Sequence, residues 1–107
     1  MKVIAMHLVQ LFLPLFDNHG RTFPHALFAE VREELVARFG GVTAFTQAPA
    51  DGVWKDGDDV PTRDRIVIFE VMCDRLERDW WADYRRLLAE RFRQEELVVR
   101  TWQVDAL

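Results

Sequence analysis

The sequence contains very little cysteine, glycine or proline. A single cysteine, Cys73, excludes an internal disulfide framework. Five Gly and four Pro among 107 residues are too few for a collagen-like or low-complexity chain. Half of the residues are apolar and 30% are charged, which is typical of a globular domain. The chain is long enough for one buried core, so we expect one domain over residues 1–107.

Positive charge and long apolar runs are also scarce. Fourteen Lys and Arg stand against 18 Asp and Glu, a net charge of −4. Nucleic-acid binding depends on cations that release counterions, so we expect no nucleic-acid partner. The apolar run from Val3 to Phe16 is interrupted by His7 and Gln10 and is too short to span a membrane. It also lacks the small-residue cleavage pattern of a secretory leader. We therefore expect a cytoplasmic protein with no membrane partner.

No recognised catalytic or metal-binding motif is present. The three histidines lie in a predicted strand, a turn and a helix start, without the spacing of a zinc site: His7, His19 and His25. Cys73 precedes a predicted helix, a position that can lower the pKa of a thiol, although a buried, inert thiol is the simpler interpretation. We expect no metal and no cofactor, and the sequence identifies no catalytic residue.

Hydrophobic periodicity, in contrast, is clear in the first half of the chain. The run from Val3 to Phe16 is apolar on both alternating faces, which predicts a central strand. After a turn, Thr22 is the expected N-cap of a helix that stops at Gly40 and Gly41. The apolar positions of this helix recur at four-residue spacing and predict its core stripe. The stripe consists of Leu27, Val31, Leu35 and Phe39, with Phe28 beside it.

The second half predicts three more strands and a second helix. We expect an edge strand, a long hairpin arm, an apolar strand and a closing strand: Val42–Gln47, Ala48–Asp64, Arg65–Cys73 and Leu97–Val104. Asp74 and Glu77 have the spacing of a capping box, which opens a helix to about Gln94. Its expected core stripe is Leu76, Trp80, Tyr84, Leu87, Leu88 and Phe92. Trp81 points about 100° away from Trp80, so we expect it on the helix flank or in contact with a partner.

This order of elements predicts an α+β fold, a ferredoxin-like βαββαβ sandwich with a four-stranded antiparallel sheet and two helices on one face. Right-handed crossovers are expected to set the first and third strands side by side and parallel, with the other two antiparallel at the edges. The rows expected to face the helices are Val9, Leu11, Leu13, Val67, Phe69, Val71, Leu97 and Val99. The opposite rows are Leu8, Gln10, Phe12, Ile66, Ile68, Glu70, Met72, Val98, Arg100 and Trp102.

The opposite face is too apolar to meet water, and stacking two copies face to face would cover it. Three segments carry a similarity to known proteins: Leu8–Phe12, Asp51–Asp56 and Arg63–Ile68. With the element order, they resemble the dimeric α+β barrel superfamily and, within it, a small bacterial family of unknown function. The resemblance implies a homodimer through the open sheet face. For some members of the superfamily it also implies proton transfer on a small aromatic or lactone-like substrate.

A polar row on this face is the candidate site. Gln10, Glu70 and Arg100 lie near the middles of three neighbouring predicted strands. With Phe12, Trp102 and His7 they are expected to line an apolar pocket for a small organic ligand, His7 being the candidate general base.

Three alternatives remain open for this face. Glu70 and Arg100 can pair with each other, or across the interface, and perform no chemistry. The face can be used entirely for self-association or for another protein. The chain can also be an ACT-like regulatory module separated from its enzyme. The sequence identifies neither the ligand nor a reaction.

Overall fold

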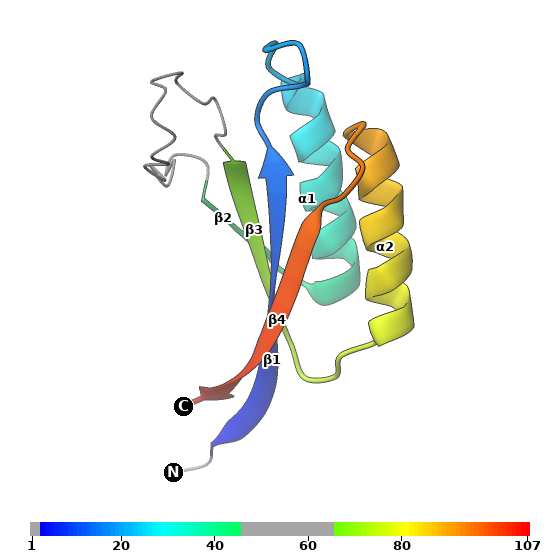
Figure 1. Ribbon diagram of the computed structural model, residues 1–107. Helices are drawn as coiled ribbons and strands as arrows, with labels where there is room; N and C mark the ends of the chain where they lie inside the picture. Colours follow the sequence, from blue (N-terminus) through cyan, green and yellow to red (C-terminus); the bar gives the residue numbers. More distant parts are fainter. Residues whose placement is uncertain (1–2, 46–65) are drawn as a thin grey trace, which may run out of the picture.

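The computed structural model describes residues 3–45 and 66–107, which form four strands and two helices (Figure 1). In chain order they are β1 (Ile4–Pro14), α1 (His25–Phe39), β2 (Thr43–Phe45), β3 (Ile66–Cys73), α2 (Arg78–Arg91) and β4 (Val98–Ala106). This order confirms the predicted βαββαβ pattern. The hairpin arm predicted over Ala48–Asp64 lies outside the described residues. Neither helix in the described ranges has the length and apolar character that a membrane crossing requires.

The four strands form one open antiparallel sheet in the order β2-β3-β1-β4. The expected parallel pairing of the first and third strands is therefore wrong. Both β1 and β2 are antiparallel to β3, so β1 and β2 run in the same direction. The α1 crossover thus joins two strands that are not adjacent, and β3 occupies the gap between them. The result is an α+β fold, compatible with a ferredoxin-like sandwich, whose two helices lie on one side of the sheet (Figure 1).

The core lies between this sheet and the helices. From Val9 to Leu13 in β1 and from Val67 to Val71 in β3, odd-numbered residues pair across the strands and are buried, as the predicted rows require. The buried sheet residues are Val9, Leu11, Leu13, Val67, Phe69, Val71 and Cys73. The helices contribute Phe28, Val31 and Leu35 from α1, and Trp81, Tyr84 and Leu88 from α2. Because strand side chains alternate, burying these residues presents the even-numbered rows on the face without helices.

Neither helix starts with the predicted cap. Pro24 is the N-cap residue of α1, with no side-chain cap, whereas Thr22 pairs with Phe16 in an isolated bridge. Glu77 is itself the N-cap residue of α2, so it cannot complete a capping box with Asp74 as an N3 residue. Its carboxylate binds Arg38 instead, at 2.6 Å. The predicted stop of α1 is confirmed, since Gly40 adopts a φ of 87° and donates to the Val36 carbonyl at 2.8 Å.

The two neighbouring tryptophans exchange their predicted roles. Trp81 is 6% exposed and belongs to the core, whereas Trp80 is half-buried and Leu87 is exposed. From Arg78 onward, the face of α2 that meets the sheet carries Trp81, which lies three residues before Tyr84 on the same stripe. Trp80 stacks on Tyr84 with 4.8 Å between ring centroids. The prediction that Trp80 lies in the core and Trp81 outside it is therefore wrong.

Candidate functional site

The sheet face without helices carries one polar row. The strand register places Gln10 directly between Glu70 on β3 and Arg100 on β4, and Thr43 of β2 extends the row beside Glu70. Sequence reasoning placed Gln10, Glu70 and Arg100 at the middles of neighbouring strands, and the structure brings them together. We call these three residues the polar row.

Hydrogen bonds link the polar row into a chain. The Gln10 amide nitrogen donates to a Glu70 carboxylate oxygen, and the Gln10 amide oxygen accepts from Nε of Arg100 at 3.0 Å. Within the described residues, Glu70 and Arg100 make no direct ion pair. Gln10 therefore separates the Glu70 carboxylate from the Arg100 guanidinium, and it satisfies part of the hydrogen-bonding capacity of each group.

Arg100 lies beside two aromatic rings. The centre of its guanidinium is 4.8 Å from the ring centroid of Phe12 and 5.8 Å from that of Trp102. Such a cation beside the face of a ring is held by the ring's negative electrostatic potential. The terminal nitrogens of Arg100 have no hydrogen-bond partner in the part of the chain that the structure describes. They can donate to an acceptor that approaches this face.

Apolar side chains surround the polar row. Four large ones on this face are between 41% and 54% exposed: Phe45, Met72, Val98 and Trp102. Leu8, Phe12 and Ile68 beside them are half-buried. The register places them on the same side as the polar row, because directly paired residues of neighbouring strands share a face. The face is therefore an apolar surface crossed by one line of hydrogen-bonded polar groups.

His7 does not join this site. It pairs with Cys73 and Gln103 and lies on the same face as Val9, opposite to Gln10. The expectation that it lines the pocket overlooked the alternation of β1, in which odd and even positions point to opposite faces.

His19 lies in an exposed turn and His25 begins α1. No group of three or more His, Cys, Asp or Glu within the described ranges is arranged to hold a metal ion.

Cys73 is buried, and its environment opposes thiolate formation. Burial raises the pKa of the thiol above its ordinary 9.0, and the nearby carboxylates of Asp74 and Glu77 raise it further. Its position just before α2 does not lower the pKa, so the interpretation as an inert core thiol is favoured.

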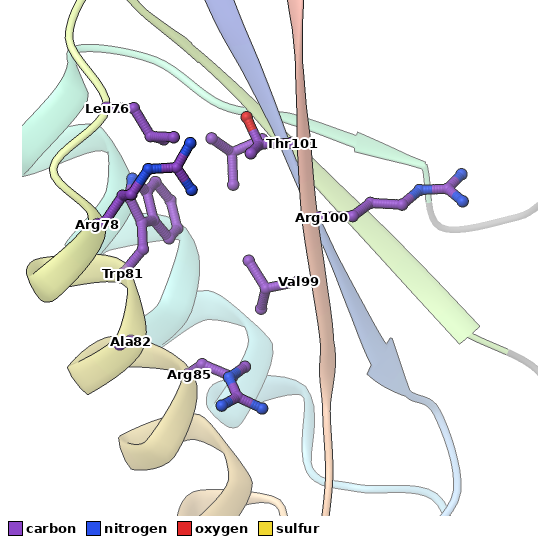
Figure 2. Close-up of a pocket in the computed structure, with 9 residues that line it drawn as sticks. Leu76, Arg78, Trp81, Ala82, Arg85, Val99, Arg100 and Thr101 are labelled. Atoms are coloured by element: carbon purple, nitrogen blue, oxygen red, sulfur yellow. The ribbon is translucent and has the colours of Figure 1, made fainter.

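Sequence reasoning missed a hollow that lies between α2 and β4 on the helix side of the sheet (Figure 2). Its volume is about 200 Å³. The lining residues include Trp81 and Thr101, which occupy core-facing positions. Each has one polar side-chain group, the indole N–H of Trp81 and the hydroxyl of Thr101. The signal available in the sequence was Thr101, a polar residue in a row that is otherwise made of valines and leucines and was expected to face the helices. The hollow itself depends on the separation of α2 from the edge strand, which periodicity does not determine.

Comparison of the chain with protein-family models, with curated proteins and with solved structures finds no match in any of the three. Of the segments that carry the resemblance to dimeric α+β barrels, Leu8–Phe12 lies in β1 and residues 66–68 lie in β3. The segment Asp51–Asp56 and residues 63–65 fall outside the described residues.

Proposed function

We propose that the chain functions as a ferredoxin-like homodimer that stacks its two open sheet faces and encloses a small organic ligand between them. The observation that carries this proposal is the exposure of Phe45, Met72, Val98 and Trp102 on one face. Monomers seldom leave a contiguous apolar patch of this kind in water. A second copy covers it economically, because a two-fold axis lets the same surface serve both subunits.

The charges of the polar row support a second copy as the partner and favour one orientation. Glu70 lies on one side of Gln10 and Arg100 on the other. A two-fold axis along β1, between the sheets, exchanges these sides and sets Glu70 opposite the partner's Arg100. Stacked sheets lie about 10 Å apart, a gap that two long facing side chains can bridge. An axis across the strands instead sets like charges opposite each other, which is unfavourable.

Arg100 supports a ligand in the enclosed space. Its terminal nitrogens remain available, while Phe12 and Trp102 flank the guanidinium. A planar apolar molecule with a carbonyl or carboxylate oxygen matches this combination of donors and rings. Gln10 and Glu70 then hold Arg100 in place through the hydrogen-bonded chain.

One observation favours a second candidate function, a self-association module without a ligand. Gln10 already bonds to both of its charged neighbours, so part of the polar row is satisfied within one subunit. If ion pairs between Glu70 of one subunit and Arg100 of the other use the remaining donors and acceptors of the polar row, few hydrogen-bonding groups are left to bind a ligand.

Native mass spectrometry of the purified protein separates these candidates. The proposal predicts a dimer that carries additional mass from an enclosed molecule. A dimer without additional mass, even after incubation with small aromatic acids, favours the self-association module. A monomer at all protein concentrations contradicts both, because the sheet face then needs another cover.

A further inference from the structure

The hollow between α2 and β4 has the properties of a binding site for a small anion. Val9, Leu76 and Val99 give it apolar walls. A water molecule has about 30 Å³ in the liquid, so a volume of about 200 Å³ accommodates one small organic molecule. It lies on the opposite side of the sheet from the polar row, because Thr101 and Val99 alternate with Arg100 along β4. Figure 2 shows the Arg100 side chain pointing away from the others.

Two buried polar atoms at this hollow lack partners. Nε1 of Trp81 and Oγ1 of Thr101 are both buried, and neither makes a hydrogen bond within the described residues. Buried polar atoms are nearly always bonded, and an unsatisfied one calls for an explanation, such as a ligand or water that completes it. The indole nitrogen only donates, and the hydroxyl can donate as well. Both orphan atoms can therefore donate, although surrounding atoms cover them in this structure.

Two arginines bracket the hollow from α2. Figure 2 shows Arg78 and Arg85 extending toward β4, with Val99 between them. Neither makes an ion pair or a hydrogen bond within the described residues, whereas the neighbouring Arg86 binds Asp83 at 3.1 Å. No Asp or Glu belongs to the described lining of the hollow. In a chain with a net charge of −4, two unpaired cations at one opening produce a local positive potential.

We propose that this hollow binds a small organic monocarboxylate. Its apolar body lies against Val9, Leu76 and Val99. Its carboxylate accepts charge-assisted hydrogen bonds from the guanidinium groups of Arg78 and Arg85, which neutralise it. A carboxylate offers acceptors only, which matches a lining that offers donors and cations.

Benzoate and benzamide test the proposal, because they have the same shape and differ in charge. The readout is the indole N–H signal of Trp81 in ¹H–¹⁵N NMR spectra, assigned by its loss in Trp81→Phe. Benzoate is expected to shift this signal in a saturable way, with a dissociation constant of about 1 mM or tighter. Benzamide is expected to bind at least about tenfold more weakly, since a neutral amide accepts hydrogen bonds but carries no negative charge to pair with the two guanidinium groups.

Variants locate the site. The double change Arg78→Gln with Arg85→Gln removes both cations and is expected to weaken benzoate binding at least about tenfold. Arg86→Gln is the matched control on the same helix and leaves the affinity unchanged. Glu70→Gln, on the other sheet face, also leaves the Trp81 response unchanged, which distinguishes this site from the proposed dimer cavity. The proposal is overturned if benzoate leaves the Trp81 signal in place, if benzamide binds equally well, or if Arg86→Gln weakens binding as much as the double change.

Discussion

Arg91 binds both carboxylate oxygens of Glu34, with nitrogen–oxygen distances of 2.9 Å each, and thereby joins α2 to α1. The hydroxyl of Tyr84 donates to the same carboxylate at 2.8 Å. These bonds favour the ionised form, so Arg91 first, and then Tyr84, lower the pKa of Glu34 below its ordinary 4.5 despite partial burial. Burial and this bond together raise the pKa of Tyr84. The cluster fixes how the two helices pack beside each other over the sheet.

Acid is expected to weaken the fold through Glu34. Because folding lowers its pKa, the stabilisation is fully present above the unfolded value of 4.5 and is lost as the pH falls through the lower folded value. Glu34→Gln should reduce the free energy of unfolding by about 1 kcal/mol at neutral pH, and this difference from wild type should shrink in acid, as the pH falls below 4.5. Urea denaturation at fixed protein concentration measures both.

Glu33→Gln is the control for this prediction, since Glu33 is exposed and makes no ion pair within the described residues. It should change the free energy of unfolding by less than about 0.5 kcal/mol at either pH. A difference between wild type and Glu34→Gln that is the same at both pH values would contradict the role of the ionised carboxylate.

Removing each of the two tryptophans should have unequal effects. Trp81→Ala is expected to cost about 3–5 kcal/mol because it leaves a cavity in the core. Trp80→Ala removes the same atoms from a half-buried position beside Arg38, whose guanidinium lies 4.3 Å from the Trp80 ring, and should cost about 1–2 kcal/mol. Thermal unfolding compares the two. Equal losses, or a larger loss at Trp80, would contradict the observed packing of α2.

Thr101→Val should leave the protein equally stable or make it more stable by up to about 1 kcal/mol. The buried Thr101 hydroxyl has no partner in the described part of the chain, so it contributes no hydrogen bond there, and an apolar group of the same shape removes its desolvation cost. Thr43→Val, at an exposed position of β2, serves as the control. A loss above about 1 kcal/mol at Thr101 alone would show that its hydroxyl has a partner in solution, against the account of an unoccupied donor.

A charge on the open sheet face should dissociate the proposed dimer, whereas the same charge on a helix should not. Met72 and Val36 are similarly exposed, at 48% and 43%, but Met72 lies on the open face and Val36 on α1. Met72→Glu places an unpaired charge in the interface and should weaken dimerisation at least about thirtyfold, or about 2 kcal/mol. Light scattering after size-exclusion chromatography measures this. Dissociation by Val36→Glu instead would place the interface on the helix side.

The sequence predicted the parts of the fold that depend on alternation over several residues. The buried rows from Val9 to Leu13 and from Val67 to Val71 follow from period-two burial, and the polar row follows from the same register. Strand direction was predicted less well. A crossover between strands that are not adjacent leaves no local pattern, so the parallel pairing of the first and third strands was wrong.

The sequence-based prediction also misplaced the first residues of both helices and the face of α2 that enters the core. One residue decides whether Trp80 or Trp81 enters the core, and the apolar spacing of α2 admits both. Thr22 and Asp74 had the side chains of good caps, but the bridge to Phe16 and the start of α2 at Arg78 excluded them. His7 was placed on the wrong face of the sheet, because it occupies an odd position of β1 and the candidate site uses the even positions. The hollow at Trp81 depends on the spacing between α2 and β4, for which the sequence has no periodic signal.

The central claim, a dimer in which Glu70 faces the partner's Arg100, is tested most directly by charge exchange. Glu70→Arg and Arg100→Glu each set like charges opposite each other, so each variant alone should be a folded monomer. When the two variants are mixed, every facing pair becomes complementary again, and a heterodimer should form. Native mass spectrometry with one variant isotope-labelled identifies that species. If both variants remain dimers on their own, or if the mixture forms no heterodimer, the proposed face-to-face arrangement is contradicted.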